Sequence, residues 1–122
     1  MAAPYALVVE DDPEAAFIFK QALEDAGFQA DIVDTGHRAQ ARLIFTTPDL
    51  ILLDMHLPRL SGKVVLRQLR GQRRLDNVRI IIATGDERAA RQYANWADQV
   101  LVKPVGYEQV RELASGLLPT AV

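Results

Sequence analysis

The polar residues that could carry out chemistry directly follow short apolar runs along this chain of 122 residues. Asp54 ends the run 50–53, and an ionised carboxylate at the end of a buried run is costly unless a nearby group stabilises its charge. The other members of this set are Glu10 and Asp11 after the first run, Thr84 after the fourth and Lys103 after the fifth. If these runs are strands of one parallel sheet, their carboxyl ends bring the set to one edge, where open sheets bind ligands.

Three carboxylates, a hydroxyl and an ammonium group in one place suit a divalent metal ion and a phosphoryl group. Two carboxylates about 4 Å apart repel by roughly 4 kcal/mol at an effective dielectric constant of about 20, so a cation is needed to keep both ionised. Mg²⁺ binds one or two carboxylates, keeps several waters and holds substrate phosphate in the remaining positions. In this interpretation Asp54 attacks phosphorus to form an aspartyl phosphate, while Thr84 and Lys103 contact the other phosphoryl oxygens.

Each of these residues, taken alone, also has an ordinary structural explanation. The acidic run 10–12 could be the N-terminal cap of a helix, which is the commoner meaning of such a run. Thr84 could open a turn before a glycine, and Lys103 before a proline could be a surface pair. The functional interpretation depends on their joint placement after strands one, three, four and five.

The elements that must position these residues alternate regularly between short apolar runs and segments with helical periodicity. Unbroken Val, Ile and Leu runs suit strands that are covered on both faces. The predicted strands are 5–9, 28–33, 50–53, 79–83 and 99–102, and the predicted helices are 13–26, 36–46, 62–70, 87–95 and 106–118. These elements fill residues 1–122, which predicts one α/β domain with a parallel sheet wrapped by helices.

The first and last helices show the clearest apolar faces. Asp12 can cap the first helix, Pro13 occupies its first position, and Gly27 ends it. Its predicted buried face comprises Ala15, Ile18, Phe19, Ala22, Leu23 and Ala26, and the last helix should bury Val110, Leu113, Ala114 and Leu117. Phe17 lies off the first apolar face, so it is either an interface anchor or a single exposed apolar side chain.

Composition excludes several classes of protein. Hydrophobic residues at 49% and charged residues at 25% are ordinary globular values, and the absence of cysteine excludes disulfides and thiolate metal sites. No apolar run approaches the roughly 20 residues of a membrane helix, and no signal peptide precedes the first strand. We therefore expect a soluble cytoplasmic protein with no membrane partner.

Basic residues concentrate in the segment 59–79, which holds seven of them against Asp76 alone. Nucleic acid binding is one interpretation of such a run. The spacing of four bases is that of the solvent-exposed side of one helix: Lys63, Arg67, Arg70 and Arg74. This favours an ordinary solvated surface without direct nucleic acid binding.

The sequence resembles the receiver domains of bacterial two-component response regulators, such as the chemotaxis response regulator, over essentially the whole chain. The resemblance rests on "VVEDDP" (8–13), "DMHLPRLSG" (54–62), "ATG" (83–85) and "VKP" (102–104), in the right order and at the right distances. It implies a flavodoxin-like, doubly wound (βα)₅ fold with strand order 2-1-3-4-5 and a single receiver domain over 1–122.

The resemblance also implies a role for each site residue. Asp54 would be the phosphoacceptor. Mg²⁺ or Mn²⁺ would be bound by Asp54, by Asp11 directly, by Glu10 mainly through water, and by the backbone carbonyl of His56. Thr84 would be the switch hydroxyl, and Lys103 would pair with phosphate and precede Pro104 through a peptide bond that is usually cis. The donor would be a phosphohistidine on a histidine kinase or phosphotransfer protein, the downstream effector is unknown, and the chain would be a monomer or weak homodimer.

Three positions depart from the family pattern or tune it. Val100 stands where the family usually has an aromatic residue that turns inward after phosphorylation. Tyr93, Trp96 and Tyr107 lie near that surface and could substitute, although aromatic residues there are more often partly buried packing. His56 and Asp86, which in this family flank the path of the attacking water, could tune the phosphoryl lifetime, although His56 is better interpreted as a partly exposed loop residue.

Other functions remain open at this point. The chain could be a phosphorelay intermediate or a receiver used only for docking. A magnesium-dependent aspartyl-phosphate phosphatase is less favoured, because such enzymes carry a second acid two residues after the nucleophile and His56 stands there. A nucleotide-binding protein is disfavoured because neither glycine-rich phosphate loop occurs. As a receiver, the protein would catalyse only its own phosphorylation and dephosphorylation.

Overall fold

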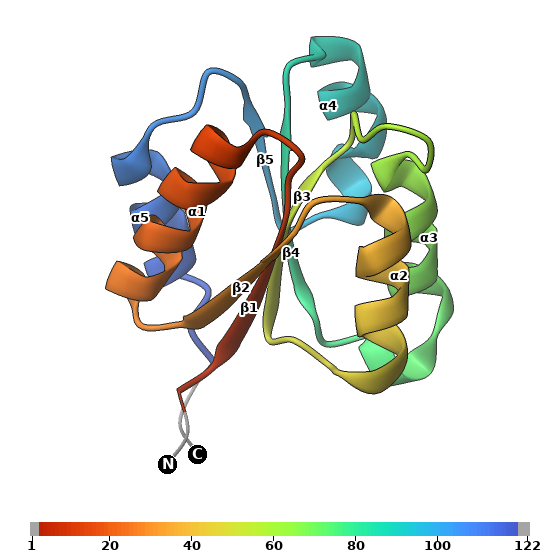
Figure 1. The fold of residues 1–122 in the computed structure, drawn as a ribbon, viewed down its shortest axis with the longest axis horizontal. Coiled ribbons are helices and arrows are strands. Elements are labelled where there is room, and N and C mark those ends of the chain that lie inside the picture. The colour runs from red at the N-terminus through yellow and green to blue at the C-terminus, as the bar shows by residue number, and fades with distance from the viewer. Residues whose placement is uncertain (1–2, 120–122) are drawn as a thin grey trace.

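The computed structural model describes residues 3–119, which form one five-stranded parallel sheet covered by helices on both faces (Figure 1). The strands lie in the order β2-β1-β3-β4-β5, as the family resemblance implied. Their bounds are β1 Tyr5–Val9, β2 Gln29–Val33, β3 Leu50–Asp54, β4 Arg79–Thr84 and β5 Gln99–Val102. The helices are α1 Pro13–Ala26, α2 Gly36–Phe45, α3 Gly62–Gly71, α4 Glu87–Tyr93 and α5 Tyr107–Ser115, with 3₁₀ turns η1 Arg73–Leu75 and η2 Ala94–Trp96.

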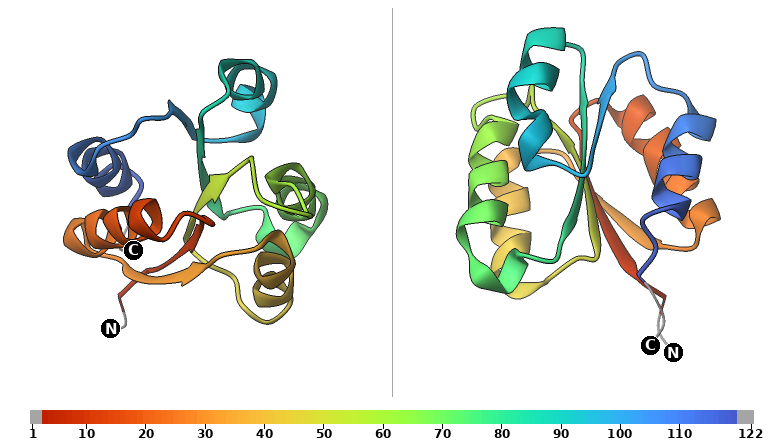
Figure 2. Two further views of the ribbon diagram at one scale, coloured as in Figure 1. Left: turned by 45° about the horizontal axis from the view of Figure 1, so that its top comes forward. Right: turned by 180° about the vertical axis from the view of Figure 1, so that it is seen from behind.

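The helices divide between the two faces of the sheet and create two apolar cores (Figures 1 and 2). Helices α1 and α5 cover one face, and α2, α3 and α4 cover the other. Every residue of the central strand β3 is buried, which explains why its sequence is an unbroken apolar run up to the terminal aspartate. The fold class is therefore confirmed as α/β with a doubly wound sheet.

The strand register places the polar residues at one edge of the sheet. Val9 pairs with Leu53, so Glu10 and Asp54 follow directly after paired positions on neighbouring strands. Asp54 in turn pairs with Ala83, directly before Thr84. The carboxyl ends of β1, β3 and β4 therefore coincide, as parallel strands of matched length require.

The first helix begins and ends as predicted. The side chain of Asp12 accepts a hydrogen bond from the backbone N–H of Glu14, Pro13 begins the helix, and Gly27 adopts a positive φ of 115°.

The apolar face of the first helix differs from the prediction at three positions. Ala15 and Ile18 were predicted to be buried, but Ala15 is only partly buried and Ile18 is 38% exposed. Ala16, which was not predicted to be buried, is buried. Helical periodicity identifies the side of a helix that faces inward, but it does not show how far the neighbouring helix covers that side.

The fourth and fifth helices are shorter than predicted. Helix α4 ends at Tyr93 and tightens into η2, and α5 ends at Ser115 rather than at 118. Gly116 follows α5, and glycine is a poor helix former. Leu113 and Leu117 consequently lie at the border of the core rather than inside it. Within the described residues, no helix has both the length and the apolar composition needed to cross a lipid bilayer.

Candidate functional site

Three carboxylates meet at the carboxyl edge of the sheet. One carboxylate oxygen from each of Glu10, Asp11 and Asp54 lies within 4.8 Å of the other two. Glu10 and Asp54 are almost completely buried, at 1% and 4% exposed, whereas Asp11 is exposed to solvent. The predicted convergence of the first and third strands is therefore confirmed at the level of side chains.

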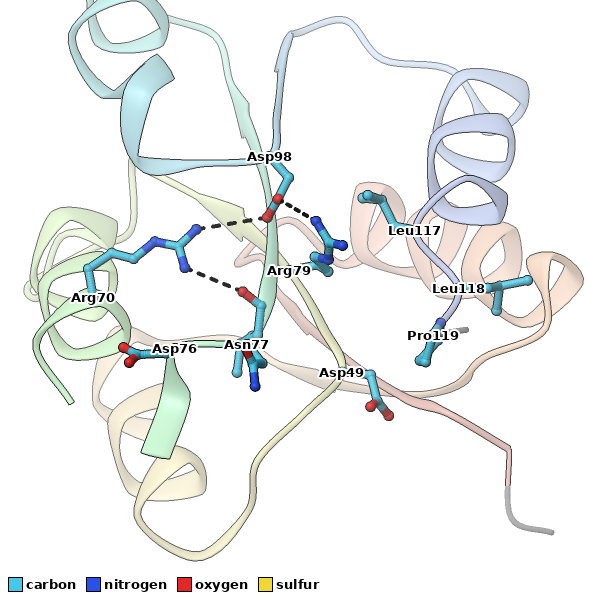
Figure 3. Close-up of a pocket in the computed structure, with 10 residues that line it drawn as sticks. Asp49, Arg70, Asp76, Asn77, Arg79, Asp98, Leu117, Leu118 and Pro119 are labelled. Atoms are coloured by element: carbon cyan, nitrogen blue, oxygen red, sulfur yellow. Dashed lines mark hydrogen bonds and ion pairs between the residues drawn. The ribbon is translucent and has the colours of Figure 1, made fainter. Parts of the chain in front are cut away.

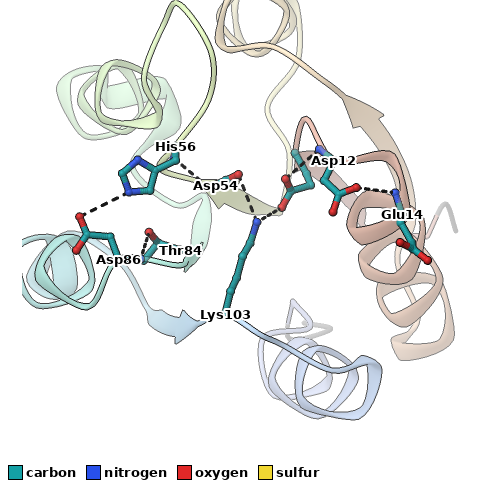
Figure 4. Close-up of polar contacts among 8 residues, drawn as sticks. Asp12, Glu14, Asp54, His56, Thr84, Asp86 and Lys103 are labelled. Carbon is teal, nitrogen blue, oxygen red and sulfur yellow. Dashed lines mark hydrogen bonds and ion pairs between the residues drawn. The ribbon is translucent and has the colours of Figure 1, made fainter.

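Asp54 is held by the loop that follows it. Its Oδ1 atom accepts a hydrogen bond of 2.9 Å from the backbone N–H of His56 (Figure 4). This contact keeps the peptide of His56 beside the carboxylate, while the imidazole points away and remains 61% exposed. The role of the His56 carbonyl as a metal ligand stays a prediction.

Lys103 provides a positive charge next to two of the carboxylates (Figure 4). Its Nζ atom lies 2.6 Å from Glu10 Oε1 and 3.4 Å from Asp54 Oδ2, and its peptide bond to Pro104 is cis as predicted. Partial burial lowers the pKa of Lys103, but the hydrogen bond to Glu10 and the charge of Asp54 outweigh burial and leave that pKa raised.

The ionised form of the Glu10 carboxyl group is disfavoured even though Lys103 lies next to it. Burial raises the pKa of Glu10 to about 7, the hydrogen bond from Lys103 opposes the rise, and the neighbouring charge of Asp54 adds to it. One ammonium group therefore does not fully compensate a buried carboxylate that shares its site with two others. A second cation would stabilise the ionised form of Glu10.

Thr84 is completely buried at the end of β4, beside the aspartate strand. Its hydroxyl oxygen accepts a hydrogen bond of 3.1 Å from the backbone N–H of Asp86, which holds the β4–α4 loop (Figure 4). Within residues 3–119 its hydroxyl makes no hydrogen bond to Asp54 or Lys103. Thr84 therefore lies at the carboxyl edge of the sheet, as predicted, but its hydroxyl is bonded to the β4–α4 loop rather than to the carboxylate cluster.

His56 and Asp86 face each other across the mouth of the site. His56 Nε2 lies 3.6 Å from Asp86 Oδ2, and both side chains are substantially exposed. A backbone hydrogen bond from Arg88 is the main cause that lowers the pKa of Asp86, and the proximity of His56 adds to it. Asp86 also caps α4, so its carboxylate accepts a hydrogen bond from the start of that helix and lies beside His56 of the β3–α3 loop.

Gly62 is a supporting residue to which the sequence analysis gave no role. A β-carbon at this position would collide with the carbonyl oxygen of Asp54 and lie 2.8 Å from Cα of Met55. The backbone N–H of Gly62 also donates to the carbonyl of Met55. The start of α3 therefore packs directly against the backbone that presents Asp54. In the sequence, Gly62 was the last residue of the motif 54–62 and the first position of a predicted helix, and neither signal indicated this contact.

The aromatic residues considered as substitutes near Val100 lie on different sides of the sheet. Val100 is half-buried and packs with Tyr93 against the α3 side, and Tyr93 contacts Trp96 edge to face with ring centroids 6.3 Å apart. Tyr107 instead packs on the other face, where its hydroxyl donates to Asp25 of α1. Val100 and Tyr107 therefore pack on opposite faces of the sheet, which does not support Tyr107 as a substitute for the missing aromatic residue.

A pocket lies at the opposite edge of the sheet, and none of the three clustered carboxylates lines it (Figure 3). Four of its charged residues are paired with one another or with the backbone: Asp49, Arg70, Arg79 and Asp98. Asp98 accepts hydrogen bonds from Arg79 and from the backbone N–H of Ile80, and Arg70 lies 3.8 Å away. These contacts fix the start of β4 and β5, which is a structural role.

The donor set of the carboxylate cluster fits a hard divalent cation. All available side-chain ligands are oxygen atoms, and the Lys103 ammonium group contacts only two of the three carboxylates, those of Glu10 and Asp54. Burial, together with the neighbouring charge of Asp54, raises the pKa of Glu10, so a bound cation would stabilise its ionised form. Mg²⁺ and Mn²⁺ prefer such oxygen ligands.

Comparison with known proteins agrees with this geometry. The family model described as "Response regulator receiver domain" matches residues 6–115. The phosphate regulon transcriptional regulatory protein PhoB of Rhizobium meliloti is 33% identical over 121 residues, which cover 97% of this chain and 53% of PhoB. The DNA-binding dual master transcriptional regulator RpaA of Synechocystis is 29% identical, covering 94% of this chain and 49% of RpaA. The chain thus spans about half the length of these two curated relatives.

Solved structures give the same result. A receiver domain from Methylobacillus flagellatus described as CheY-like superposes with a TM-score of 0.83 at 28% identity, covering 95% of this chain and 99% of that one. The response regulator TrrA of Thermotoga maritima, solved in complex with Mg²⁺ and BeF, has a TM-score of 0.82 at 27% identity, covering 94% and 99%. With its sheet order, carboxylate cluster and lysine, the chain belongs to the family of response regulator receiver domains of two-component systems.

Proposed function

We propose that this chain is a phosphoacceptor module in which Asp54 receives a phosphoryl group from a phosphohistidine of a histidine kinase or phosphotransfer protein. The observation that carries the proposal is the placement of a buried carboxylate at the end of β3, within 4.8 Å of two further carboxylates and 3.4 Å from Lys103 Nζ. A purely structural acid would not need this costly arrangement.

In the transfer step, a carboxylate oxygen of Asp54 forms a bond to phosphorus while the bond between phosphorus and the donor imidazole nitrogen breaks. The imidazole leaves with the electron pair of that bond. The His56 N–H holds the carboxylate in position, and Lys103 lies where it stabilises negative charge on the transferred group. The Thr84 hydroxyl would exchange its loop hydrogen bond for one to the phosphoryl group.

Glu10, Asp11, Asp54 and the His56 carbonyl would hold Mg²⁺ or Mn²⁺. When bound, this cation neutralises charge on the carboxylates and on the phosphoryl oxygens. In the same proposal Lys103 exchanges part of its contact with Glu10 for contact with phosphate. The chain catalyses only its own phosphorylation and dephosphorylation, and a surface that changes with phosphorylation signals to an effector of unknown identity.

The test is chemical labelling of the complete chain. Purified protein is incubated with acetyl phosphate and Mg²⁺, and its intact mass is measured with and without EDTA. We expect a single phosphoryl adduct that is stable in acid, labile in base, absent with EDTA and absent in Asp54→Asn.

Three outcomes would contradict the proposal. Absence of any adduct in folded wild-type protein would indicate a receiver used only for docking. Continued release of phosphate from many phosphomonoesters would indicate a phosphatase. Retention of the adduct in Asp54→Asn would show that another residue accepts the phosphoryl group.

A further inference from the structure

Helices α2 and α3 lie side by side on one face of the sheet, and η1 follows α3 and is itself followed by Asp76 (Figures 1 and 2). Gln68 of α3 donates a hydrogen bond to the backbone carbonyl of Gln40 in α2, which joins the two helices. The sequences of α2, α3 and η1 contain seven basic residues and no aspartate or glutamate. Three of these bases form ion pairs with aspartates: Arg38, Arg42 and Arg70. The other four, which we name the basic face, are Lys63, Arg67, Arg73 and Arg74.

The charges of the basic face are not compensated by the rest of the described chain. Lys63, Arg67 and Arg73 form no ion pair with any residue in 3–119. Arg74 donates hydrogen bonds to the carbonyl oxygens of Leu43 and Thr46, which are neutral acceptors. Arg74 therefore fixes the end of α2 while its positive charge stays unbalanced.

Two large apolar side chains stand exposed next to this charge. Ile44 is 62% exposed and Phe45 is 85% exposed, both in the last turn of α2. The carbonyls that Arg74 contacts, at 43 and 46, flank these two residues, so the guanidinium lies against the same turn. Single exposed apolar side chains are normal, but an adjacent aliphatic and aromatic pair beside arginines has the composition of an interface centre.

We propose that the basic face together with Ile44 and Phe45 is a docking surface for an acidic polypeptide segment that carries apolar side chains among its carboxylates. Charge complementarity selects the acidic partner, and the exposed pair supplies its anchor. The apolar pair and Arg74 lie at the C-terminal end of α2, away from the carboxylate cluster, whereas Lys63 follows Gly62 at the near end of α3. The docking interaction uses no phosphoryl group, so the inference does not depend on phosphoryl transfer.

Two features favour a polypeptide over nucleic acid. Ile44 and Phe45 offer no hydrogen bond to a phosphate backbone, and Arg74 next to them already donates to backbone carbonyls. That turn is also the C-terminal end of α2, whose partial negative charge opposes phosphate. Acidic side chains between apolar ones can avoid the helix end and still reach Arg67 and Arg73.

The experiment is a titration of the complete ¹⁵N-labelled chain with a synthetic amphipathic peptide that places Leu and Phe at helical spacing among Glu residues. A second peptide has Lys at every Glu position. We expect the acidic peptide alone to shift amide signals, concentrated in 40–47 and 63–74, with affinity that falls as salt is added.

Matched variants distinguish binding at this surface from non-specific binding of the peptide. Phe45→Ser and Arg67→Glu should each weaken the acidic peptide by roughly fivefold or more. Phe17→Ser on α1 and Arg88→Glu on α4 are the controls, since both residues are exposed elsewhere and should leave the affinity unchanged. Unchanged circular dichroism in all four variants establishes that folding is intact.

Several outcomes would overturn the inference. Equal binding of the lysine peptide, signal shifts spread over α1 or α4, or an equal loss in the control variants would each reject it. Tighter binding of a duplex DNA through Phe45 and Arg67 would assign the surface to nucleic acid instead. Concentration-dependent self-association that disappears in the same variants would assign it to a second copy of this chain.

Discussion

The Nζ atom of Lys103 lies 2.6 Å from Oε1 of Glu10, although the strands that precede them, β5 and β1, are separated by β3 and β4 in the sheet. The lysine side chain therefore reaches across the carboxyl edge to the first strand. On the way it passes 3.4 Å from Asp54. One flexible ammonium group is consequently shared between a metal-binding candidate and the phosphoacceptor candidate.

Removing this ammonium group should affect metal binding and phosphorylation in opposite directions. In Lys103→Met the three carboxylates lose their cation, so Mg²⁺ should bind more tightly than to wild type. Labelling by acetyl phosphate should slow by roughly tenfold or more, because charge on the transferring group is less well stabilised. Calorimetry with Mg²⁺ and time-resolved intact mass measure the two effects.

Lys20→Met is the control for that variant, because Lys20 lies on α1 outside the cluster and should change neither quantity. Equal weakening of metal binding and labelling in Lys103→Met would indicate general damage to the site. It would contradict a role for Lys103 specific to the phosphoryl group.

Stability without divalent metal should depend on pH through Glu10. The pKa of this carboxyl is about 7 in the folded chain, raised mainly by burial from the ordinary value of 4.5. A group with a higher pKa in the folded state binds its proton preferentially there, so its stabilisation is full below pH 4.5 and is lost as the pH rises through about 7. Glu10→Gln cannot titrate and lacks this loss.

The free energy of unfolding should therefore fall in wild type relative to Glu10→Gln by about 2 kcal/mol between about pH 5 and about pH 8. Urea unfolding in EDTA at the two pH values measures the difference. A constant difference between the two proteins would show that Glu10 keeps an ordinary pKa.

Divalent metal should stabilise the folded chain through Asp11. A ligand that binds only the folded state contributes about 2.7 kcal/mol at a free concentration about 100 times its dissociation constant. Adding Mg²⁺ should raise the melting temperature of wild type, and Asp11→Asn should lose most of that increase. Glu14→Gln, which changes an exposed acid in the first turn of α1, should keep it. Equal stabilisation of all three proteins would place the ion outside the carboxylate cluster.

Much of the fold was predictable because local chemistry and tertiary packing agree. The run 50–53 is apolar without alternation, and β3 is indeed covered on both faces. Asp12, Pro13 and Gly27 marked the ends of α1 through capping and backbone preferences that act within a few residues. The convergence of Glu10 and Asp54 followed from parallel strands alone.

The features that could not be predicted depend on contacts between distant segments. The exposure of Ile18 is set by how far α5 covers α1, and periodicity carries no information about that coverage. The pairing of His56 with Asp86 joins the loops that follow β3 and β4, and the sequence does not specify how these two loops are positioned relative to each other. The close approach of Gly62 to the Asp54 backbone likewise required the course of the loop between β3 and α3.

Gly62→Ala should therefore damage both stability and the site. The added methyl group meets backbone atoms of Asp54 and Met55, which cannot turn aside as a side chain could. Forcing such a group into a packed region costs typically about 1 to 3 kcal/mol. The loop must shift, and the His56 N–H that holds Asp54 Oδ1 shifts with it. We expect a lower free energy of unfolding and slower labelling by acetyl phosphate in the fraction that remains folded.

Gly71→Ala provides the matched control at the other end of the same helix. A β-carbon at Gly71 would meet no atom within 4 Å, and alanine forms helix better than glycine by about 1 kcal/mol. This variant should be as stable as wild type or more stable, with unchanged labelling. If Gly62→Ala matched Gly71→Ala in both measurements, the β3–α3 loop would be free to move without consequence, and Gly62 would have no part in positioning the carboxylate of Asp54.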